Sequence, residues 1–555
     1  MKTAVTRLSH GLVQAGSRAG HRRFVRALGD LENVQRGRLS AILKQAAPTR
    51  FGRASGISSD WSYDEFASRF PVSDYGFWSP WIEKQRATKE AVLAPECSRF
   101  QPTSGSSDAL KWIPYSKALL AEFDQAVSPW MVDMARLAPG ILEGKHYWSL
   151  SWMPNNLRAS STSTDDLEVL PTWKRALMNQ IMVVDGRLAR AATSEAALFA
   201  SLAGLAAAAD LSLMSVWSPT FALNLIQEIT ERKNELSSVL ASGKWLHWSD
   251  QLSDFRAPQS ARAAELLNVW DGKDPRAFFR HLWPRLRLIS AWESASSYPY
   301  AERLKEFFPH ACFQGKGLWA TEGVVTIPFE GSYPLALNSH FYEFKCLTTG
   351  KVVPSWKLER DQTVQPLLTT GAGFLRYALP DRMEVTGFVG QTPSLVFRER
   401  LNGCDLVGEK MSSSNANETL RALSKSGGFE QVTPICLIAN APEGVQPSYV
   451  VLAEGRENAE LSQACAEFVE ERLKISFHYR LARELNQLAP ARALVNPEAL
   501  RIYEECCLAK GMILGNIKVE PLIEYRQNLN DYFGGDVWPK RASAGATAAS
   551  LTIGI

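Results

Sequence analysis

The stretch LLTTGAGFLRYALPDRMEVTGF, residues 367–388, places a glycine turn, an Arg–Tyr pair and an acid immediately before a strand signal. It continues as MEVTGFVG, a short run of mainly apolar and β-branched residues that lies between Asp381 and Gly390. Such a run predicts a β-strand. Asp381 at the entrance of this strand is either a ligand-binding acid or a simple turn former.

The residues around this stretch extend the β pattern. VVTIPF (324–329) and SLVFRER (394–400) are also short runs that contain β-branched and apolar residues, with glycine, proline or aspartate close to each. Before residue 300, apolar residues instead recur every three or four positions, as in RAPQSARAAELLNVW (256–270) and YAERLKEFFP (300–309), which predicts helices. The sequence therefore predicts an α/β chain.

A second domain is predicted near residue 411, because 555 residues exceed what one core usually serves. MSSSNANETL (411–420) is polar and resembles a linker. Beyond it the pattern predicts a helix, strands at VTPICLIA (432–439) and SYVVLAEG (448–455), and a long helical region. We therefore predict a large domain over 1–411 and a small α+β domain over 412–555.

Composition and charge exclude several classes of protein. The formal net charge of +3 lacks the basic excess of a nucleic-acid-binding protein. The most apolar run, 196–210, is too short for stable membrane insertion and predicts a packed helix. Eight scattered cysteines without a CxxC pair predict a reduced, cytoplasmic chain. The first 29 residues, which are basic and lack acids, form either a targeting or membrane-surface segment or simply a basic first helix.

A hydroxyl-rich loop, TSGSSDALKWIP (103–114), is the best candidate for a phosphate site. Backbone N–H groups at a glycine turn and small hydroxyls are suitable donors to phosphate oxygens, and Lys111 could add a positive charge. The spacing is not that of a Walker A loop. Alone, this loop is equally well explained as a polar surface turn.

Read together, the motifs resemble those of the acyl-adenylate-forming superfamily, and more closely its auxin-responsive branch, the acyl acid–amido synthetases. The resemblance rests on five segments in fixed order: TSGSSDALKWIP (103–114), ATEGVVTIPF (320–329), residues 368–388, TPSLVF through GEK (392–410), and FHYRLARELNQL (477–488). It covers residues from about 50 to about 521. It implies a large adenylating domain with mixed β-sheets, a β-barrel-like part and packed helices, followed by a small mobile domain.

The resemblance also implies a role for each matching residue. The predicted phosphate-binding group contains Ser104, Gly105, Ser106, Ser107 and Lys111. Thr321 and Glu322 match a pair in which the acid holds Mg²⁺ near the α-phosphate of ATP. Asp381 matches the acid that binds the ribose hydroxyls, and Lys518, in GNIKVEP (515–521), matches the catalytic lysine of the mobile domain.

The chain departs from the family pattern at several positions. Pro380 replaces the glycine before the ribose acid, and Leu318 stands where the superfamily often has a tyrosine that stacks on adenine. Trp319 is one candidate to stack there instead. Lys410, in GEK, is either a hinge contact or a solvated lysine.

The resemblance implies a ligase that uses ATP and Mg²⁺ to activate a small carboxylic acid as acyl-AMP and transfers it to an amine, with an amino acid as the expected acceptor, forming an amide. The alternatives are transfer to a thiol of coenzyme A or a carrier protein, and a degenerate member that only binds ligands. We expect the acyl pocket near HYWSLSW (146–152) and LMNQIMVVDG (177–186). The chain's aromatic content, which includes 17 tryptophans, favours an aryl or fatty acid.

Overall fold

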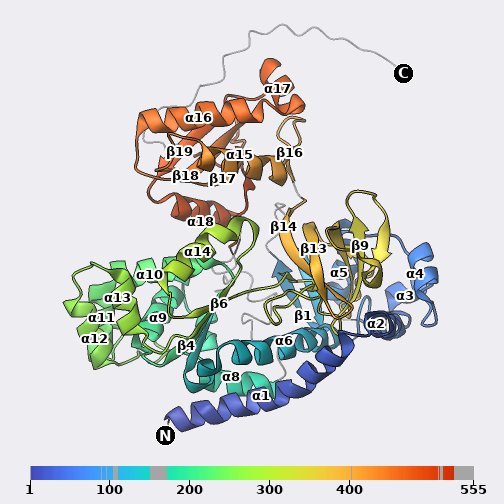
Figure 1. Cartoon of the computed structure of the whole chain (residues 1–555), viewed down its shortest axis with the longest axis horizontal. Coiled ribbons are helices and arrows are strands. Elements are labelled where there is room, and N and C mark those ends of the chain that lie inside the picture. The colour runs from blue at the N-terminus through green and yellow to red at the C-terminus, as the bar shows by residue number, and fades with distance from the viewer. Residues whose placement is uncertain are drawn as a thin grey trace. The chain divides into compact units, whose positions relative to one another are not determined.

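The computed structural model describes residues 2–88, 90–95, 97–103, 111–149, 172–401, 403–510, 512 and 517–529. The chain forms two compact units (Figure 1). The first comprises residues 1–400 and 511–518, and the second comprises residues 401–510 and 519–555.

The first unit begins with five helices: α1 (Lys2–Ala27), α2 (Leu31–Ala46), α3 (Arg50–Ala54), α4 (Tyr63–Arg69) and α5 (Tyr75–Thr88). The basic N-terminal segment is thus a helix, and it packs against α6 (Lys117–Leu137) and α8 (Thr172–Ile181). Its His10 Nε2 lies 2.8 Å from the carbonyl oxygen of Gly144. This buried contact joins α1 to the segment that leads into the first parallel strand.

A parallel sheet forms one core of this unit. Its order is β3 (Lys145–Trp148), β4 (Leu211–Ser215), β5 (Leu288–Ala291) and β6 (Cys312–Gly315). The surrounding helices are α9 (Ser194–Ala207), α10 (Pro219–Glu231), α11 (Lys233–Ser242), α12 (Ala261–Val269), α13 (Pro275–Leu282) and α14 (Tyr298–Phe307). Helix α9, from the most apolar run, is buried in this core. No helix within the described ranges is long and apolar enough to cross a membrane.

An antiparallel sheet forms the second core of the unit, in the order β10 (Val352–Pro354), β9 (Phe341–Cys346), β11 (Thr363–Thr369), β13 (Asp381–Val389) and β14 (Thr392–Arg400), with β12 (Tyr377–Ala378) paired to β11. Two hairpins belong to the same unit: β1 (Cys97–Thr103) with β2 (Lys111–Ser116), and β7 (Trp319–Ala320) with β8 (Gly323–Val324). The strands predicted at 383–390 and 394–400 are therefore confirmed. The strand predicted over 324–329 is wrong after Val324, where only isolated bridges form.

The second unit has a four-stranded sheet with the order β19 (Arg492–Asn496), β18 (Ser448–Glu454), β17 (Thr433–Asn440) and β20 (Leu522–Tyr525). The helices are α15 (Ser413–Lys425), α16 (Ala459–Leu473), α17 (Phe477–Glu484) and α18 (Ala499–Ala509). Figure 1 shows α16 and α18 on opposite sides of this sheet. A short pair, β15 (Gly403–Cys404) with β16 (Met411–Ser412), precedes it.

The prediction of a linker at 411–420 is wrong. Ser412 ends β16, and its hydroxyl accepts a hydrogen bond from the backbone N–H of Asn415, which caps α15. Serine and asparagine suit loops and helix N-termini for the same reason, since their side chains bond to the nearby backbone. The α/β class predicted from the sequence is confirmed by the sheets and helices of both units.

Candidate active site

The hydroxyl loop connects the two strands of the β1–β2 hairpin. Thr103 and Lys111 are paired at the end of this hairpin, in the first unit. Ser104, Gly105, Ser106 and Ser107 lie outside the described residues, as does the rest of 104–110. Lys111 is partly buried, and its Nζ lies 5.5 Å from the centre of the Tyr75 ring.

Thr321 and Glu322 occupy the two-residue turn of the β7–β8 hairpin. The Glu322 side chain is buried, and its Oε1 accepts a hydrogen bond of 3.2 Å from the hydroxyl of Tyr377. Burial raises the pKa of the Glu322 carboxyl, and the negative charge of Asp381 raises it further. The Tyr377 hydroxyl and the positive charge of Lys111 oppose this shift.

Asp381 is the first residue of β13 and is also buried. Its backbone pairs with Arg400 on β14, and the Arg400 Nε lies 3.8 Å from the Asp381 Oδ1. Lys111 and Asp381 both act electrostatically on Glu322, and the three residues are called the charged group below. The group contains two acids and one ammonium from three segments that are distant in sequence.

Two tyrosines complete this group, although neither was among the predicted site residues. Tyr377 lies on β12 and binds Glu322 directly. Tyr75, at the start of α5, accepts a hydrogen bond of 2.8 Å from the backbone N–H of Trp112, the residue after Lys111. Tyr377 could have been suspected from the motif that contains Asp381, whereas no sequence signal connects Tyr75 to the site.

The glycine turn before Tyr377 is held by a buried ion pair. Arg376 has a φ of 50°, in the left-handed region, and its guanidinium binds both carboxylate oxygens of Glu343 at 2.8 and 3.0 Å. It also donates to the carbonyl oxygens of Ala67 and Phe70. These bonds fix the backbone conformation from which Tyr377 reaches Glu322.

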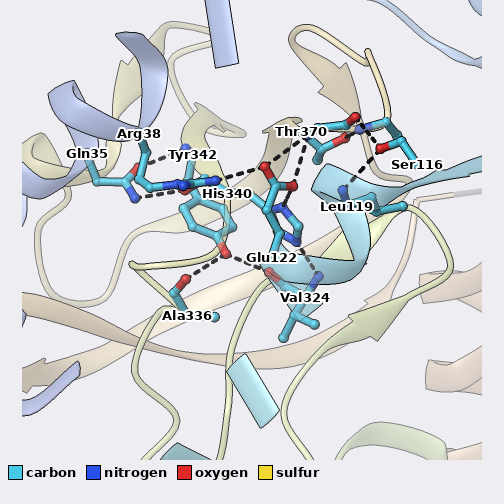
Figure 2. A network of polar contacts seen from close by, with 12 residues as sticks. Gln35, Arg38, Ser116, Leu119, Glu122, Val324, Ala336, His340, Tyr342 and Thr370 are labelled. Atoms are coloured by element: carbon cyan, nitrogen blue, oxygen red, sulfur yellow. Dashed lines mark hydrogen bonds and ion pairs between the residues drawn. The ribbon is translucent and has the colours of Figure 1, made fainter. Parts of the chain in front are cut away.

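A second buried network, shown in Figure 2, joins the Glu322 hairpin to the same glycine turn. Its centre is Glu122 on α6, which is 4% exposed. The carboxylate accepts hydrogen bonds from Arg38 Nη2 (2.8 Å), His340 Nδ1 (2.7 Å) and the backbone N–H of Gly371 (2.9 Å). It therefore lies where α2, α6, β9 and the glycine turn meet.

His340 connects Glu122 to the β7–β8 hairpin. Its Nε2 accepts a hydrogen bond of 3.0 Å from the backbone N–H of Val324, two residues after Glu322. A Cβ on Gly323 would lie only 2.7 Å from that nitrogen, so a side chain there would displace the histidine. At the other end, Ser116, the last residue of β2, donates to the Gly371 carbonyl oxygen at 2.6 Å. The network thus touches all three segments that supply the charged group.

Replacing Glu122 by glutamine is expected to lower the free energy of unfolding by about 3 kcal/mol, because an amide cannot accept from all three donors that converge on this buried side chain. Urea unfolding measures this change. The matched control is Glu32→Gln, which breaks an exposed arginine pair with Arg36 on α2 and should cost less than about 1 kcal/mol. Equal losses in the two variants would contradict the role given to the network.

Lys518 contacts two aromatic rings of the first unit. Its Nζ is 3.6 Å from the ring centre of Phe397 on β14 and 5.4 Å from that of Trp292. Phe397 is paired with Met383, two residues after Asp381. By its contacts Lys518 belongs to the first unit, as its last residue before the chain returns to the second unit at Val519.

Three other residues singled out in the sequence are also placed. The Trp319 ring packs against Trp130 and Trp217, with ring centres 5.4 and 6.0 Å apart, so it belongs to an aromatic cluster. Pro380 is partly buried directly before Asp381. Lys410 is exposed and has a φ of 49°.

The charged group suits Mg²⁺ through its donor type. No group of three or more His, Cys, Asp or Glu side chains that could hold a metal ion occurs among the residues that the structure describes. Mg²⁺ normally needs fewer, since it is held by one or two carboxylates together with waters and substrate phosphates. Glu322 provides one buried carboxylate, which is enough protein ligand for such a site.

The expected acyl-pocket region at 177–186 borders a hollow of about 630 Å³. Among the described residues, its lining contains three arginines and no aromatic side chain: Arg175, Asn179, Gln180, Met182, Val183, Val184, Asp185, Gly186, Arg187 and Arg190. The stretch 150–152, also expected near the pocket, lies outside the described residues. This hollow therefore offers a polar, positively charged surface.

Comparison with protein families gives three matches along the chain. Residues 20–313 match the GH3 family N-terminal domain, residues 333–400 the GH3 family central domain, and residues 416–527 the GH3 family C-terminal domain. The first of these covers more than half of the 555 residues.

Similar curated proteins come from plants. The indole-3-acetic acid-amido synthetase GH3.10 of Arabidopsis thaliana is 25% identical over 240 residues, which is 38% of this chain and 40% of that protein. A probable indole-3-acetic acid-amido synthetase, GH3.6 of Oryza sativa subsp. japonica, is 25% identical over 30% of this chain and 38% of its own length. The chain thus spans about two fifths of these relatives. GH3.17 of Arabidopsis thaliana is 21% identical over 67% of this chain and 69% of that protein.

Solved structures show the same fold over nearly the whole chain. The GH3.15 acyl acid amido synthetase gives a TM-score of 0.71 at 17% identity, covering 89% of this chain and 92% of that one. Its complex with 2,4-DB gives 0.73 at 17% identity, covering 93% and 95%.

Proposed function

The chain belongs to the GH3 family, and we propose that it is a ligase that activates a carboxylic acid with ATP and joins it to an amine, with an amino acid as the expected acceptor. The family membership confirms the resemblance inferred from the motifs. The observation that supports the proposal is the buried Glu322 carboxylate, which accepts a hydrogen bond from Tyr377 and interacts electrostatically with Asp381 and with Lys111 at the end of the β1–β2 hairpin.

The chemistry requires a better leaving group than a carboxylate oxygen. A substrate carboxylate oxygen attacks the α-phosphate of ATP, the bond to pyrophosphate breaks, and an acyl-AMP forms. Lys111 and the hydroxyl loop would hold the phosphate oxygens, and Asp381 would accept hydrogen bonds from the ribose hydroxyls. These residues act by positioning and by compensating charge, so no protein nucleophile is needed.

Glu322 is the residue that would hold Mg²⁺. A bound Mg²⁺ ion would neutralise phosphate charge. The carboxylate must be ionised to bind it, and burial alone favours the neutral acid. Tyr377 and Lys111 counteract that effect, which gives both residues a function at this position.

In the second step the amine nitrogen attacks the acyl carbonyl, AMP leaves and the nitrogen loses a proton, which yields an amide. Lys518 is assigned to the first step, where its ammonium would compensate the charge that develops on the α-phosphate and carboxylate oxygens. Along the chain it is the last residue before the second unit resumes at Val519, and this motivates an assignment that depends on movement of the chain.

Experiments can distinguish two alternative functions from the proposed one. A thiol acceptor would replace the amine in the second step only, and a degenerate member would bind ligands without turnover. Pro380 motivates the second rival, because proline removes a backbone donor next to the ribose acid. Offering coenzyme A, amino acids and other amines to preformed acyl-AMP separates the amide and thiol reactions.

A screen of pyrophosphate release over carboxylic acids crossed with amino acids tests the proposal. We expect release that depends on a particular acid, and an amide product that appears only when a particular amine is present. Absence of carboxylate-dependent ATP–pyrophosphate exchange across the panel would overturn the proposal. It would favour a degenerate family member that binds ligands without turnover.

We also propose that the protein works in a reducing, cytoplasmic compartment. All eight cysteines are free thiols, and five of them are partly or fully buried in the second unit (Cys404, Cys436, Cys465, Cys506 and Cys507). Free buried thiols are typical of reducing compartments.

A further inference from the structure

The exposed face of helix α1 takes no part in the proposed reaction. Figure 1 shows α6 and α8 on one side of this helix, and both pack against it. The buried residues of α1 recur every three or four positions, as in a helix that packs by one face: Thr6, Ser9, His10, Val13, Ser17, His21, Phe24 and Ala27. Most of the helix also precedes the segment that matches the GH3 family N-terminal domain, which begins at residue 20. A function of this part of α1 would therefore belong to this chain rather than to the matched domain.

The opposite face of α1 carries a row of arginines. Arg18, Arg22 and Arg26 are exposed and follow one another at four-residue spacing, so they form a line along the helix. Arg7, also exposed, continues this line, because 11 residues correspond to about three helical turns. No ion pair or hydrogen bond joins any of these four arginines to another residue that the structure describes. Since the first 29 residues contain no acid, this face attracts anions.

Large apolar side chains are exposed on the same helix. Val5, Leu8 and Leu12 are 45%, 65% and 47% exposed, and their three- and four-residue spacing makes them neighbours. Trp173 of α8 lies at Gly16, one turn beyond Leu12, where any side chain would collide with its ring. The tryptophan is itself 49% exposed. Adjoining apolar side chains that remain accessible mark a surface that contacts an apolar partner.

The neighbouring helices leave this face positively charged. Helix α8 contains Lys174 and Arg175 and no acid. On α6, the carboxylate of Asp124 is paired with the Lys174 ammonium at 2.6 Å, and Glu122 is buried in its own hydrogen-bond network. An exposed apolar row beside unpaired arginines is typical of a helix that lies in the surface of an anionic bilayer. A nucleic acid would use the arginines but would leave the apolar side chains in water.

We propose that this face of α1, together with Trp173, docks the protein on the surface of an anionic lipid bilayer. Val5, Leu8 and Leu12 enter the boundary between the head groups and the acyl chains. The arginines beside them bind lipid phosphates, while their aliphatic stems cover the apolar row. Trp173 suits the same depth, because the indole ring is favoured at the interface between membrane and water. The helix lies parallel to the bilayer and does not cross it.

The test is co-sedimentation of the full chain with vesicles of phosphatidylcholine alone and with vesicles of one part phosphatidylserine to two parts phosphatidylcholine. We expect binding to the mixed vesicles only, and weaker binding as added salt screens the arginines. The triple variant Arg18→Gln/Arg22→Gln/Arg26→Gln should bind about 100-fold more weakly, since each basic residue near an anionic surface contributes about fivefold.

Two further variants separate charge at this face from net charge and from apolar contact. Arg256→Gln/Arg280→Gln/Arg285→Gln is the matched control, because it removes the same charge at three other exposed arginines of the first unit, and it should bind like the unchanged chain. Leu8→Asn/Leu12→Asn keeps every arginine and should bind about tenfold more weakly, because its side chains gain nothing on leaving water.

No binding to the mixed vesicles, equal binding to both kinds of vesicle, or equal losses in the two arginine variants would overturn the inference. Normal binding by the leucine variant would overturn it as well, since the face would then act only as a patch of positive charge. A single-stranded oligouridine added as competitor tests that alternative. Tighter binding of the oligouridine than of the mixed vesicles, unaffected by the leucine changes, would assign the face to nucleic acid instead.

Discussion

Replacing Lys518 by alanine is expected to slow acyl-adenylate formation by about 10²–10³-fold, which corresponds to ~3–4 kcal/mol of transition-state stabilisation. The reason is electrostatic, since an aimed ammonium compensates negative charge that exists fully only during the transfer. Lys518 now lies over the rings of Phe397 and Trp292. Single-turnover measurement of acyl-AMP from ATP and a substrate acid gives the rate directly.

A second substitution separates charge from packing. Lys518→Met keeps an unbranched side chain on Phe397 and removes the ammonium, so it should be as slow as the alanine variant. Lys84, another lysine of the first unit whose Nζ lies 5.6 Å from a tryptophan ring centre, gives the matched control Lys84→Ala, which should react at the normal rate. Near-normal acyl-AMP formation in both Lys518 variants would remove the assignment.

The secondary structure was predictable where the sequence pattern and the burial agree. Helix α9 and strands β17 and β18 were expected and are present. The parallel sheet was missed, because its strands have only four or five residues and the two central ones, β4 and β5, are entirely buried. A short apolar run buried on all sides lacks the alternation that identifies a strand, so it resembles part of a helix.

The candidate site was also predictable only in part. Lys111, Glu322 and Asp381 stand in local motifs, and the structure brings them together. The buried support for these residues has no local signal. Glu122 and His340 are 218 positions apart, and each resembles an ordinary polar residue in its own segment. Only the fold shows that they hold the backbone on either side of the site.

The aromatic cluster was predictable only in part. Trp148, in the stretch 146–152 where the acyl pocket is predicted, packs against Trp130 and lies near the Lys316 ammonium. Trp217 and Trp292 come from other strand ends, and their meeting depends on the sheet order β3–β4–β5–β6. That order could not be inferred without first recognising the parallel strands. The Trp319 ring packs with Trp130 and Trp217, and its stacking on adenine stays a prediction.

Replacing Glu322 by glutamine is expected to lower the adenylation rate by about 10²-fold at fixed Mg²⁺ and to raise the Mg²⁺ concentration needed for half-maximal rate. Glutamine keeps the shape of the side chain and an oxygen that can accept from Tyr377. It removes the negative charge that a hard divalent cation requires from its protein ligand. A Mg²⁺ titration of ATP–pyrophosphate exchange measures both effects.

The matched control is Glu470→Gln in the second unit, which also changes a buried carboxylate bound to a tyrosine, since the Tyr479 hydroxyl donates to Glu470 at 2.7 Å. That variant should lower stability without shifting the Mg²⁺ midpoint, because Glu470 is far along the chain from every segment of the charged group. An unchanged midpoint in Glu322→Gln would show that the metal is held elsewhere. A shifted midpoint with restored rate at high Mg²⁺ would identify this carboxylate as the protein ligand, because added metal can offset weaker binding but cannot repair a misfolded site.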